Sequence, residues 1–239
     1  MILKSIIFNI IFYFSILIFG LIFLPTLASR KWTAKAVRFW AKLIILCLKK
    51  IFNISIIFKN NYVMKNEGAL IAANHKSAFE TIYFLAIYEK VIYVVKKELQ
   101  YLPIYGWYAM RLGNIFVDRK KKIESIRRLS KNIEYFIANG FKVIVFPEGT
   151  RQAENAIGKI KPGIFLIQSI TKRPIYPIYI RSGGAWPRNS FLKYKKNIFL
   201  ISLNPIKYGL SKELIKKRLK KNFETLEKQE RLGNDSKSK

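Results

Sequence analysis

The only histidine of the chain, His75, lies in the stretch AANHKSAFET, five residues before Glu80. The residues before it have the apolar pattern of a β-strand, and those from Ser77 onward have the pattern of a helix. His75 therefore falls in a strand-to-helix turn, where open α/β sheets place ligand sites. An imidazole there can act as a general base, and a carboxylate one helical turn later can fix its tautomer. Ser77 and Glu80 also have the spacing of a capping box, and one carboxylate can serve both purposes.

Basic side chains follow other predicted strands. Arg119 ends the segment GNIFVDR, and Arg151 ends the segment VIVFPEGTR. Gly149 permits an unusual backbone angle, so this second loop can present Glu148 and Arg151 to one pocket. Lys161 precedes a further turn in KIKPG. Arginine suits bidentate phosphate binding and lysine supplies a point charge, although an Asp-Arg pair such as the one in GNIFVDR can be a surface salt bridge. One base with several cations indicates a site that deprotonates a phosphorylated substrate.

The elements that must position these residues alternate between strands and helices. Seven segments have strand character: 54–58, 69–73, 91–95, 115–117, 142–146, 175–180 and 198–203. Several are near-continuous apolar runs, as expected of strands covered on both faces. One intervening helix has a clear apolar face, closed by a glycine: Ile123, Ile126, Leu129, Ile133, Phe136 and then Gly140. The pattern predicts an α/β fold with a mostly parallel sheet of about seven strands flanked by helices, over residues 53–227, followed by a charged flexible tail at 228–239.

The N-terminal segment, residues 1–52, is predicted to be membrane-associated. Residues 5–29 carry no charged side chain, which is enough for a span of about 20 residues. A cleaved signal peptide is the alternative, but the run exceeds the roughly 7–15 apolar residues of a signal core and basic residues follow at once. Residues 31–52 have an amphipathic helical pattern with two tryptophans, typical of a helix at the membrane interface. One span and a re-entrant pair of helices both fit this segment.

Composition restricts the class of protein further. Hydrophobic residues make up 51% of the 239 residues, yet the formal net charge is +30. Biased codon usage can explain part of the lysine excess, but the combination is typical of a protein at an anionic membrane surface. The absence of zinc-finger, RNA-recognition or basic-zipper patterns argues against nucleic-acid binding. The single histidine and single cysteine, Cys47, argue against a transition-metal site.

The segments NHKSAFE, GNIFVDR, FPEGTR and YPI, in this order, resemble the four motif blocks of glycerolipid acyltransferases. The resemblance is closest to the 1-acylglycerol-3-phosphate acyltransferases and spans roughly residues 65–205. The first motif of that family has the form His-x4-Asp, with the histidine as base and the acid holding it. His75 and Glu80 match these positions, and the glutamate is one methylene longer than the usual aspartate.

The resemblance implies roles for further residues. Those expected to hold the phosphate and glycerol of the acceptor are Arg119, Glu148, Gly149, Thr150 and Arg151, with Lys97 and Lys161 at basic positions nearby. Those expected to shape the acyl-binding side are Tyr176, Pro177 and Ile178. Backbone amides of the His75 turn, or Asn74, are candidate donors to the oxyanion.

The implied function is acyl transfer from a thioester of coenzyme A or of an acidic acyl carrier protein to lysophosphatidic acid, giving phosphatidic acid in phospholipid biosynthesis. No cofactor or metal is expected. Membrane phospholipids are the other expected partners, and the expected location is the cytoplasmic membrane, with the catalytic domain on the cytoplasmic face. One alternative is an acyltransferase for another lyso-lipid, such as a lysophospholipid or an amino-acid lipid. The other is a non-catalytic basic membrane-binding protein, in which His75 would be dispensable.

Overall fold

A computed structural model of the protein describes residues 1–65, 68–118 and 132–235. Seven strands of this described part form one sheet in the order β1-β7-β6-β2-β5-β3-β4. Their bounds are β1 Ile56–Lys59, β2 Ala69–Ala73, β3 Val91–Lys96, β4 Ile115–Val117, β5 Lys142–Val145, β6 Ile175–Arg181 and β7 Ile198–Ser202. Neighbouring strands are parallel except for β6 and β7. All seven predicted strands are confirmed, with ends that differ by at most two residues.

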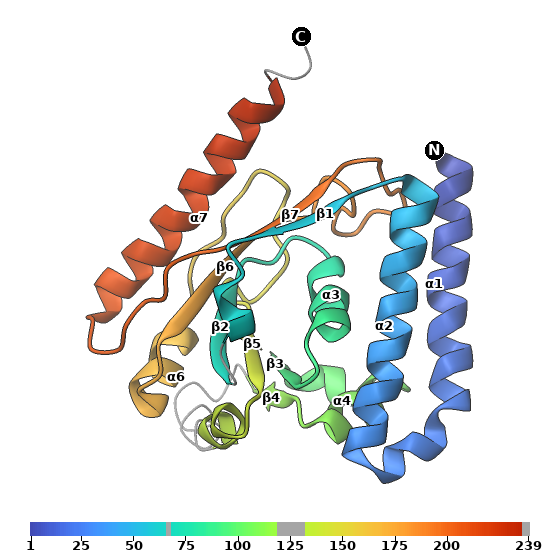
Figure 1. The fold of residues 1–239 in the computed structure, drawn as a ribbon, viewed down its shortest axis with the longest axis horizontal. Coiled ribbons are helices and arrows are strands. Elements are labelled where there is room, and N and C mark those ends of the chain that lie inside the picture. The colour runs from blue at the N-terminus through green and yellow to red at the C-terminus, as the bar shows by residue number, and fades with distance from the viewer. Residues whose placement is uncertain (66–67, 119–131, 236–239) are drawn as a thin grey trace.

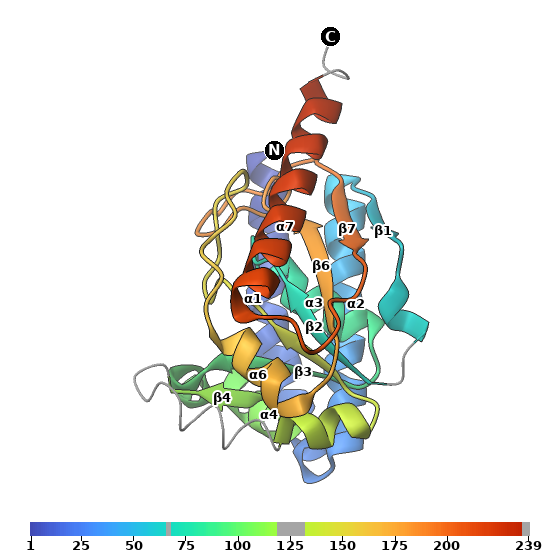
Figure 2. The ribbon, with the colours of Figure 1, turned by 90° about the vertical axis from the view of Figure 1, so that its left-hand side faces the viewer.

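Helices cover both faces of the sheet. Their bounds are α1 Ile2–Ile22, α2 Arg30–Phe52, α3 Phe79–Ile87, α4 Tyr105–Leu112, α6 Gly163–Thr171 and α7 Lys212–Asp235, with 3-10 turns η1 Leu24–Ala28, η2 Tyr62–Lys65 and η3 Lys97–Tyr101. The α1–α2 pair and α3 lie on one side, and α6 and α7 lie on the other (Figures 1 and 2). The central strand β2 is buried along its whole length, as its continuous apolar run predicts.

The predicted helix that ends at Gly140 lies partly outside the described residues. Residues 132–138 are helical, and Ile133 and Ile137 pack in the core beneath α6 and α7. Gly140 has a φ of 82°, the left-handed conformation that glycine adopts at the end of a helix. The C-terminal end of this prediction is therefore confirmed.

The N-terminal helices form a hairpin that packs on the α/β domain. η1 reverses the chain between α1 and α2, which lie side by side (Figure 1). Phe8 of α1 and Leu48 and Phe52 of α2 belong to the same hydrophobic core cluster as Ile71 of β2. The predicted boundary after residue 52 therefore marks a change of element type within one shared core.

The outer face of the hairpin is apolar. On α2, a stripe of seven-residue spacing is exposed to solvent, formed by Trp32, Phe39 and Leu46. α1 exposes most of its apolar side chains, and only 28% of its most apolar 18-residue stretch is buried. By length and composition α1 could cross a membrane, so the hairpin has the surface of a membrane-associated element.

Polar side chains anchor the otherwise apolar α1 to the loop between β6 and β7. Asn9 Nδ2 donates to the Phe191 carbonyl at 2.8 Å, and Asn9 Oδ1 accepts from Lys193 Nζ at 3.1 Å. Ser5 Oγ accepts from the backbone N–H of Lys193 at 3.0 Å. A polar residue in such a helix requires buried partners, and these contacts supply them. They dock the N-terminal half of α1 against the domain.

α7 is joined to the centre of the fold by a buried ion pair. The Nζ of the fully buried Lys76 lies 2.9 Å from Glu227 Oε2 and also donates to the carbonyl oxygens of Ala153, Glu154 and Ala156. α7 continues to Asp235, so the segment predicted as a flexible tail from residue 228 is helical up to that point.

We expect Glu227→Gln to lower the free energy of unfolding by about 3 kcal/mol, because it leaves the buried Lys76 ammonium without its anion. The matched control is Glu224→Gln, which removes the exposed Lys220–Glu224 pair of the same helix and should cost less than about 0.5 kcal/mol. Denaturant unfolding in detergent, followed by circular dichroism, measures both. Equal losses of unfolding free energy in the two variants would contradict the stabilising role of the buried Lys76–Glu227 pair.

Candidate active site

The turn that carries His75 begins where β2 ends at the carboxyl edge of the sheet. The residue before it, Asn74, is fully buried. Its Nδ2 donates to the carbonyl of Ile180 at 2.8 Å, and its Oδ1 accepts from the N–H of Ile180 at 2.6 Å. Asn74 therefore fixes the turn to β6, and because it is fully buried and not among the described residues that line the pocket, its amide does not face an oxyanion there.

The structure brings His75 and Glu80 into direct contact. His75 Nδ1 lies 3.2 Å from Glu80 Oε2, with the Glu80 side chain fully buried and that of His75 14% exposed. The imidazole also stacks on Phe146, with ring centroids 4.1 Å apart. Because a carboxylate only accepts hydrogen bonds, this contact assigns the proton to Nδ1. The Nε2 lone pair is then the one that can take a proton from a substrate.

Glu80 also caps α3. Its Oε1 accepts from the N–H of Lys76 at 3.3 Å, and both of its oxygens lie within 3.1 Å of the N–H of Ser77. Ser77 Oγ accepts from the N–H of Phe79 at 3.0 Å, so the reciprocal capping contacts are present. The helix begins at Phe79, with Ala78 rather than Ser77 as its N-cap. One carboxylate thus serves the helix and the imidazole together.

Glu148 holds the backbone of His75. Its Oε2 accepts from the N–H of His75 and its Oε1 from the N–H of Gly158, each at 2.7 Å. Burial raises the pKa of the Glu148 carboxyl, and these two amides act in the opposite direction. Among the described residues, those lining the pocket below do not include Glu148, whereas the resemblance implied that it holds substrate. The N–H groups of His75, Lys76 and Ser77 are thus committed to Glu148 and Glu80, and none of these three serves an oxyanion.

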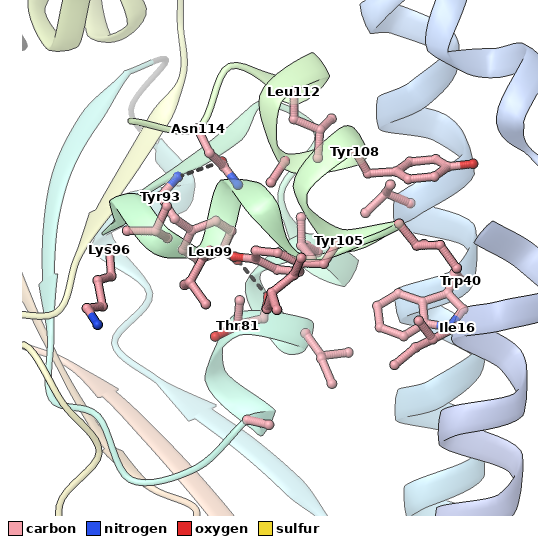
Figure 3. A pocket seen from close by; sticks show the side chains of 18 of the residues that line it. Ile16, Trp40, Thr81, Tyr93, Lys96, Leu99, Tyr105, Tyr108, Leu112 and Asn114 are labelled. Atoms are coloured by element: carbon pink, nitrogen blue, oxygen red, sulfur yellow. Dashed lines mark hydrogen bonds between the residues drawn. The ribbon is translucent and has the colours of Figure 1, made fainter. Parts of the chain in front are cut away.

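An apolar pocket of about 830 Å³ opens beside His75. Its walls come from the hairpin, α3, η3 and α4, and Figure 3 shows Ile16 and Trp40 of the hairpin opposite Leu99 and Tyr105. Hydrogen bonds brace these walls: Trp40 Nε1 donates to Ser15 Oγ, and Tyr108 OH donates to the carbonyl of Gly20, both at 2.9 Å. The pocket is therefore built between the N-terminal helices and the α/β domain.

Several of the predicted phosphate-binding residues gather at the pocket mouth. Gly149, Thr150 and Arg151 line it together with His75. Gly149 has a φ of 72°, and a Cβ there would lie 2.9 Å from Lys161 Nζ, so that amine lies over the glycine. The loop therefore shares the pocket lining with His75, whereas Lys161 lies beside the loop at Gly149 and is not among the described residues that line the pocket.

Other predicted residues lie elsewhere. Lys97 Nζ lies 3.8 Å from Asp118 Oδ2, and it is the neighbouring Lys96 that lines the pocket. The residues expected on the acyl side are in β6, beside β2 in the sheet, and are not among the described residues that line the pocket: Tyr176, Pro177 and Ile178. Ile178 is instead fully buried in the core. Arg119 lies outside the described residues.

Sequence reasoning missed Arg188 and Asn189, which line the same pocket from the loop between β6 and β7. A guanidinium nitrogen of Arg188 donates to the carbonyl oxygen of Arg151, so the two arginines adjoin. The signal was present, because WPRNS is a turn sequence with a cation that follows a buried strand at the same sheet edge.

The family model described as "Acyltransferase" matches residues 55–181, more than half of the chain, and this region contains His75, Glu80 and Arg151. The chain belongs to the acyltransferase family. It is 30% identical over 132 residues to the 1-acyl-sn-glycerol-3-phosphate acyltransferase of Pseudomonas aeruginosa, covering 55% of this chain and 51% of that protein. It is 34% identical over 114 residues to the yeast (Saccharomyces cerevisiae) protein of the same name, covering 46% and 38%. The chain thus spans about half the length, or less, of these curated relatives.

The structural comparison extends over nearly the whole chain. The crystal structure of the 1-acyl-sn-glycerophosphate (LPA) acyltransferase PlsC from Thermotoga maritima superposes with a TM-score of 0.76 at 20% identity. The match covers 96% of this chain and 95% of that one. The fold shared with that structure therefore includes the N-terminal hairpin, which lies before the family match.

We expect Glu148→Gln to lower the free energy of unfolding by about 1–3 kcal/mol, because a glutamine can accept from only one of the two buried N–H groups. Acyl-transfer activity should fall through kcat, since the backbone of His75 loses its anchor. The same change at the exposed Glu89 is the control and should alter stability by less than about 0.5 kcal/mol. A rise in KM for the acceptor with unchanged stability would instead show that Glu148 contacts substrate.

Proposed function

We propose that the protein transfers an acyl chain from a thioester to the free hydroxyl of lysophosphatidic acid and so makes phosphatidic acid for phospholipid synthesis. The observation that carries this proposal is the His75–Glu80 pair, 3.2 Å apart, at the mouth of an apolar pocket and beside Arg151. The names of the relatives from Pseudomonas and yeast support the same substrate class.

In the proposed reaction, His75 Nε2 removes the proton of the acceptor hydroxyl as its oxygen attacks the thioester carbonyl. Glu80 stabilises the imidazolium that forms. The tetrahedral intermediate then breaks its C–S bond, and the leaving thiolate takes the proton from the imidazolium. Acyl-oxygen bond formation is thus balanced by loss of the thiol, and the route uses no covalent acyl-enzyme, metal or organic cofactor.

The phosphate of the acceptor is proposed to bind at the cationic mouth of the pocket. Arg151 and Arg188 line this mouth and are exposed, so their guanidinium groups can reach a ligand. Planar guanidinium groups suit the oxygens of a phosphate, and the amine of Lys161 lies beside the same loop. Two adjoining arginines favour a dianionic phosphomonoester over a phosphodiester headgroup, and binding it fixes the hydroxyl near His75. By resemblance, Arg119 joins this group.

The apolar pocket is proposed to hold the acyl chain. Its hairpin wall also carries most of the exposed large apolar side chains of the described residues, so lipid chains can pass from a bilayer into the pocket. Basic residues on α2, including Lys31 and Lys49, favour the cytoplasmic face of the cytoplasmic membrane. Coenzyme A and acyl carrier protein are both acidic, and either thioester suits the basic mouth.

We expect the protein, in detergent or in vesicles, to make phosphatidic acid from lysophosphatidic acid and a long-chain acyl thioester. His75→Ala should lower kcat by at least ~10², the usual contribution of a positioned base. Thioesters of coenzyme A and of acyl carrier protein are compared as donors. Near-equal rates in wild type and His75→Ala would sink the mechanism.

A comparison of acceptor lipids, tested side by side, distinguishes lysophosphatidic acid from other lyso-lipids as the substrate. Lysophosphatidic acid should exceed lysophosphatidylcholine in kcat/KM by about tenfold or more, if a bidentate phosphate contact is worth about 1–3 kcal/mol. The reverse order would favour an acyltransferase for another lyso-lipid.

A further inference from the structure

A buried serine lies behind the catalytic pair on the side away from the pocket. Ser182 directly follows β6 and is fully buried. Its Oγ donates to Glu80 Oε1 and lies 3.1 Å from Ser77 Oγ. No role for Ser182 follows from the motif blocks, which end before it at YPI.

The direction of these hydrogen bonds is determined by the groups at each end. The carboxylate of Glu80 can only accept, so the single proton of Ser182 points to it. Ser77 Oγ already accepts from the N–H of Phe79, and its own proton is then free to point to Ser182 Oγ. The chain of donors therefore runs from Phe79 through Ser77 and Ser182 to Glu80, and hydrogen bonds in such a chain strengthen one another.

These hydrogen bonds give the two oxygens of the Glu80 carboxylate different partners. Oε2 contacts His75 Nδ1, and Oε1 accepts from Ser182. The backbone N–H groups distinguish less clearly between the two oxygens of Glu80. The N–H of Ser77 is 3.1 Å from Oε1 and 3.0 Å from Oε2, and that of Lys76 is 3.3 Å from Oε1. The last torsion of a glutamate has broad, soft minima, so a specific donor is needed to hold the plane of the carboxylate.

We infer that Ser182 is a positioning residue for the reaction proposed above: it holds Glu80 so that Oε2 faces His75 and the imidazole keeps its proton on Nδ1. The inference rests on the proposed function for its kinetic consequence only. Its geometric basis is the register of β6, because Asn74 binds both backbone groups of Ile180, two residues before Ser182. The same contacts that pin the His75 turn therefore also place Ser182 against Glu80.

Kinetics of single variants test the role. Ser182→Ala should lower kcat about tenfold with KM for both substrates changed by less than about twofold, since a hydrogen bond to a charged group is lost behind the site. Ser182→Thr keeps the hydroxyl and should recover most of kcat. The matched control is Ser202→Ala on the neighbouring β7, where the buried Oγ has no hydrogen-bond partner among the described residues. Equal losses of kcat in Ser182→Ala and Ser202→Ala would overturn the inference.

A double-mutant cycle separates positioning from general packing. In a Glu80→Gln background, Ser182→Ala should cost less than about twofold, because Ser182 acts through the carboxylate that is already gone. A full tenfold further loss, with melting temperatures unchanged, would show that Ser182 acts independently of Glu80 and would overturn the inference.

The single histidine allows a test that does not depend on catalysis. In protein labelled with 15N-histidine and freed of any purification tag, His75 gives the only imidazole signals. In its neutral form the wild-type imidazole should show a protonated Nδ1 and a bare Nε2, and Ser182→Ala should shift the population towards a mixture of tautomers. An unchanged spectrum in Ser182→Ala would overturn the inference. If the spectrum changes in Ser182→Ala but the wild type transfers no acyl group, the positioning role is upheld and the proposed function is refuted.

Discussion

Two buried carboxylates hold the turn that carries the imidazole, and the remainder of the site depends on them. Glu80 and Glu148 together accept the N–H groups of His75, Lys76 and Ser77. A strand that ends and a helix that has not yet begun leave these donors without backbone partners, and buried donors without acceptors are costly. The requirements of the backbone therefore place two negative groups next to a histidine. One of them touches the ring, so the same feature that stabilises the turn also orients the base.

The second constraint is the hydrophobic surface of the N-terminal hairpin. One face of α1 and α2 completes the core of the α/β domain, and the opposite face remains apolar and exposed. The pocket lies where the hairpin meets α3 and α4, so removing the hairpin from the domain would remove a wall of the site. Association with a lipid surface and construction of the pocket are thus properties of the same two helices.

The fold was largely predictable from local patterns. Strands such as β2 and β5 are short apolar runs that end at turn residues, and burial on both faces leaves few other conformations for them. The closeness of His75 and Glu80 also follows from local geometry, since a glutamate in the first turn of a helix can reach back to the residues before it. The positions of Lys76 and Ser182 were not predictable, because their partners on α7 and α3 lie about a hundred residues or more away along the chain.

The sequence by itself determined the order of the strands along the chain, the turn in which His75 lies, and the loop that brings Arg151 to the same edge. These are short-range consequences of hydrophobic periodicity and turn chemistry. Only the tertiary structure decided what each polar side chain does there. It turned Glu148 inward to backbone amides and left Tyr176 and Ile178 in the sheet, where they do not line the pocket. It also brought Arg188 to the pocket and Ser182 to the Glu80 carboxylate. The physical reason is that a buried polar group takes whichever partner the packing of distant segments offers, and local sequence does not specify that partner.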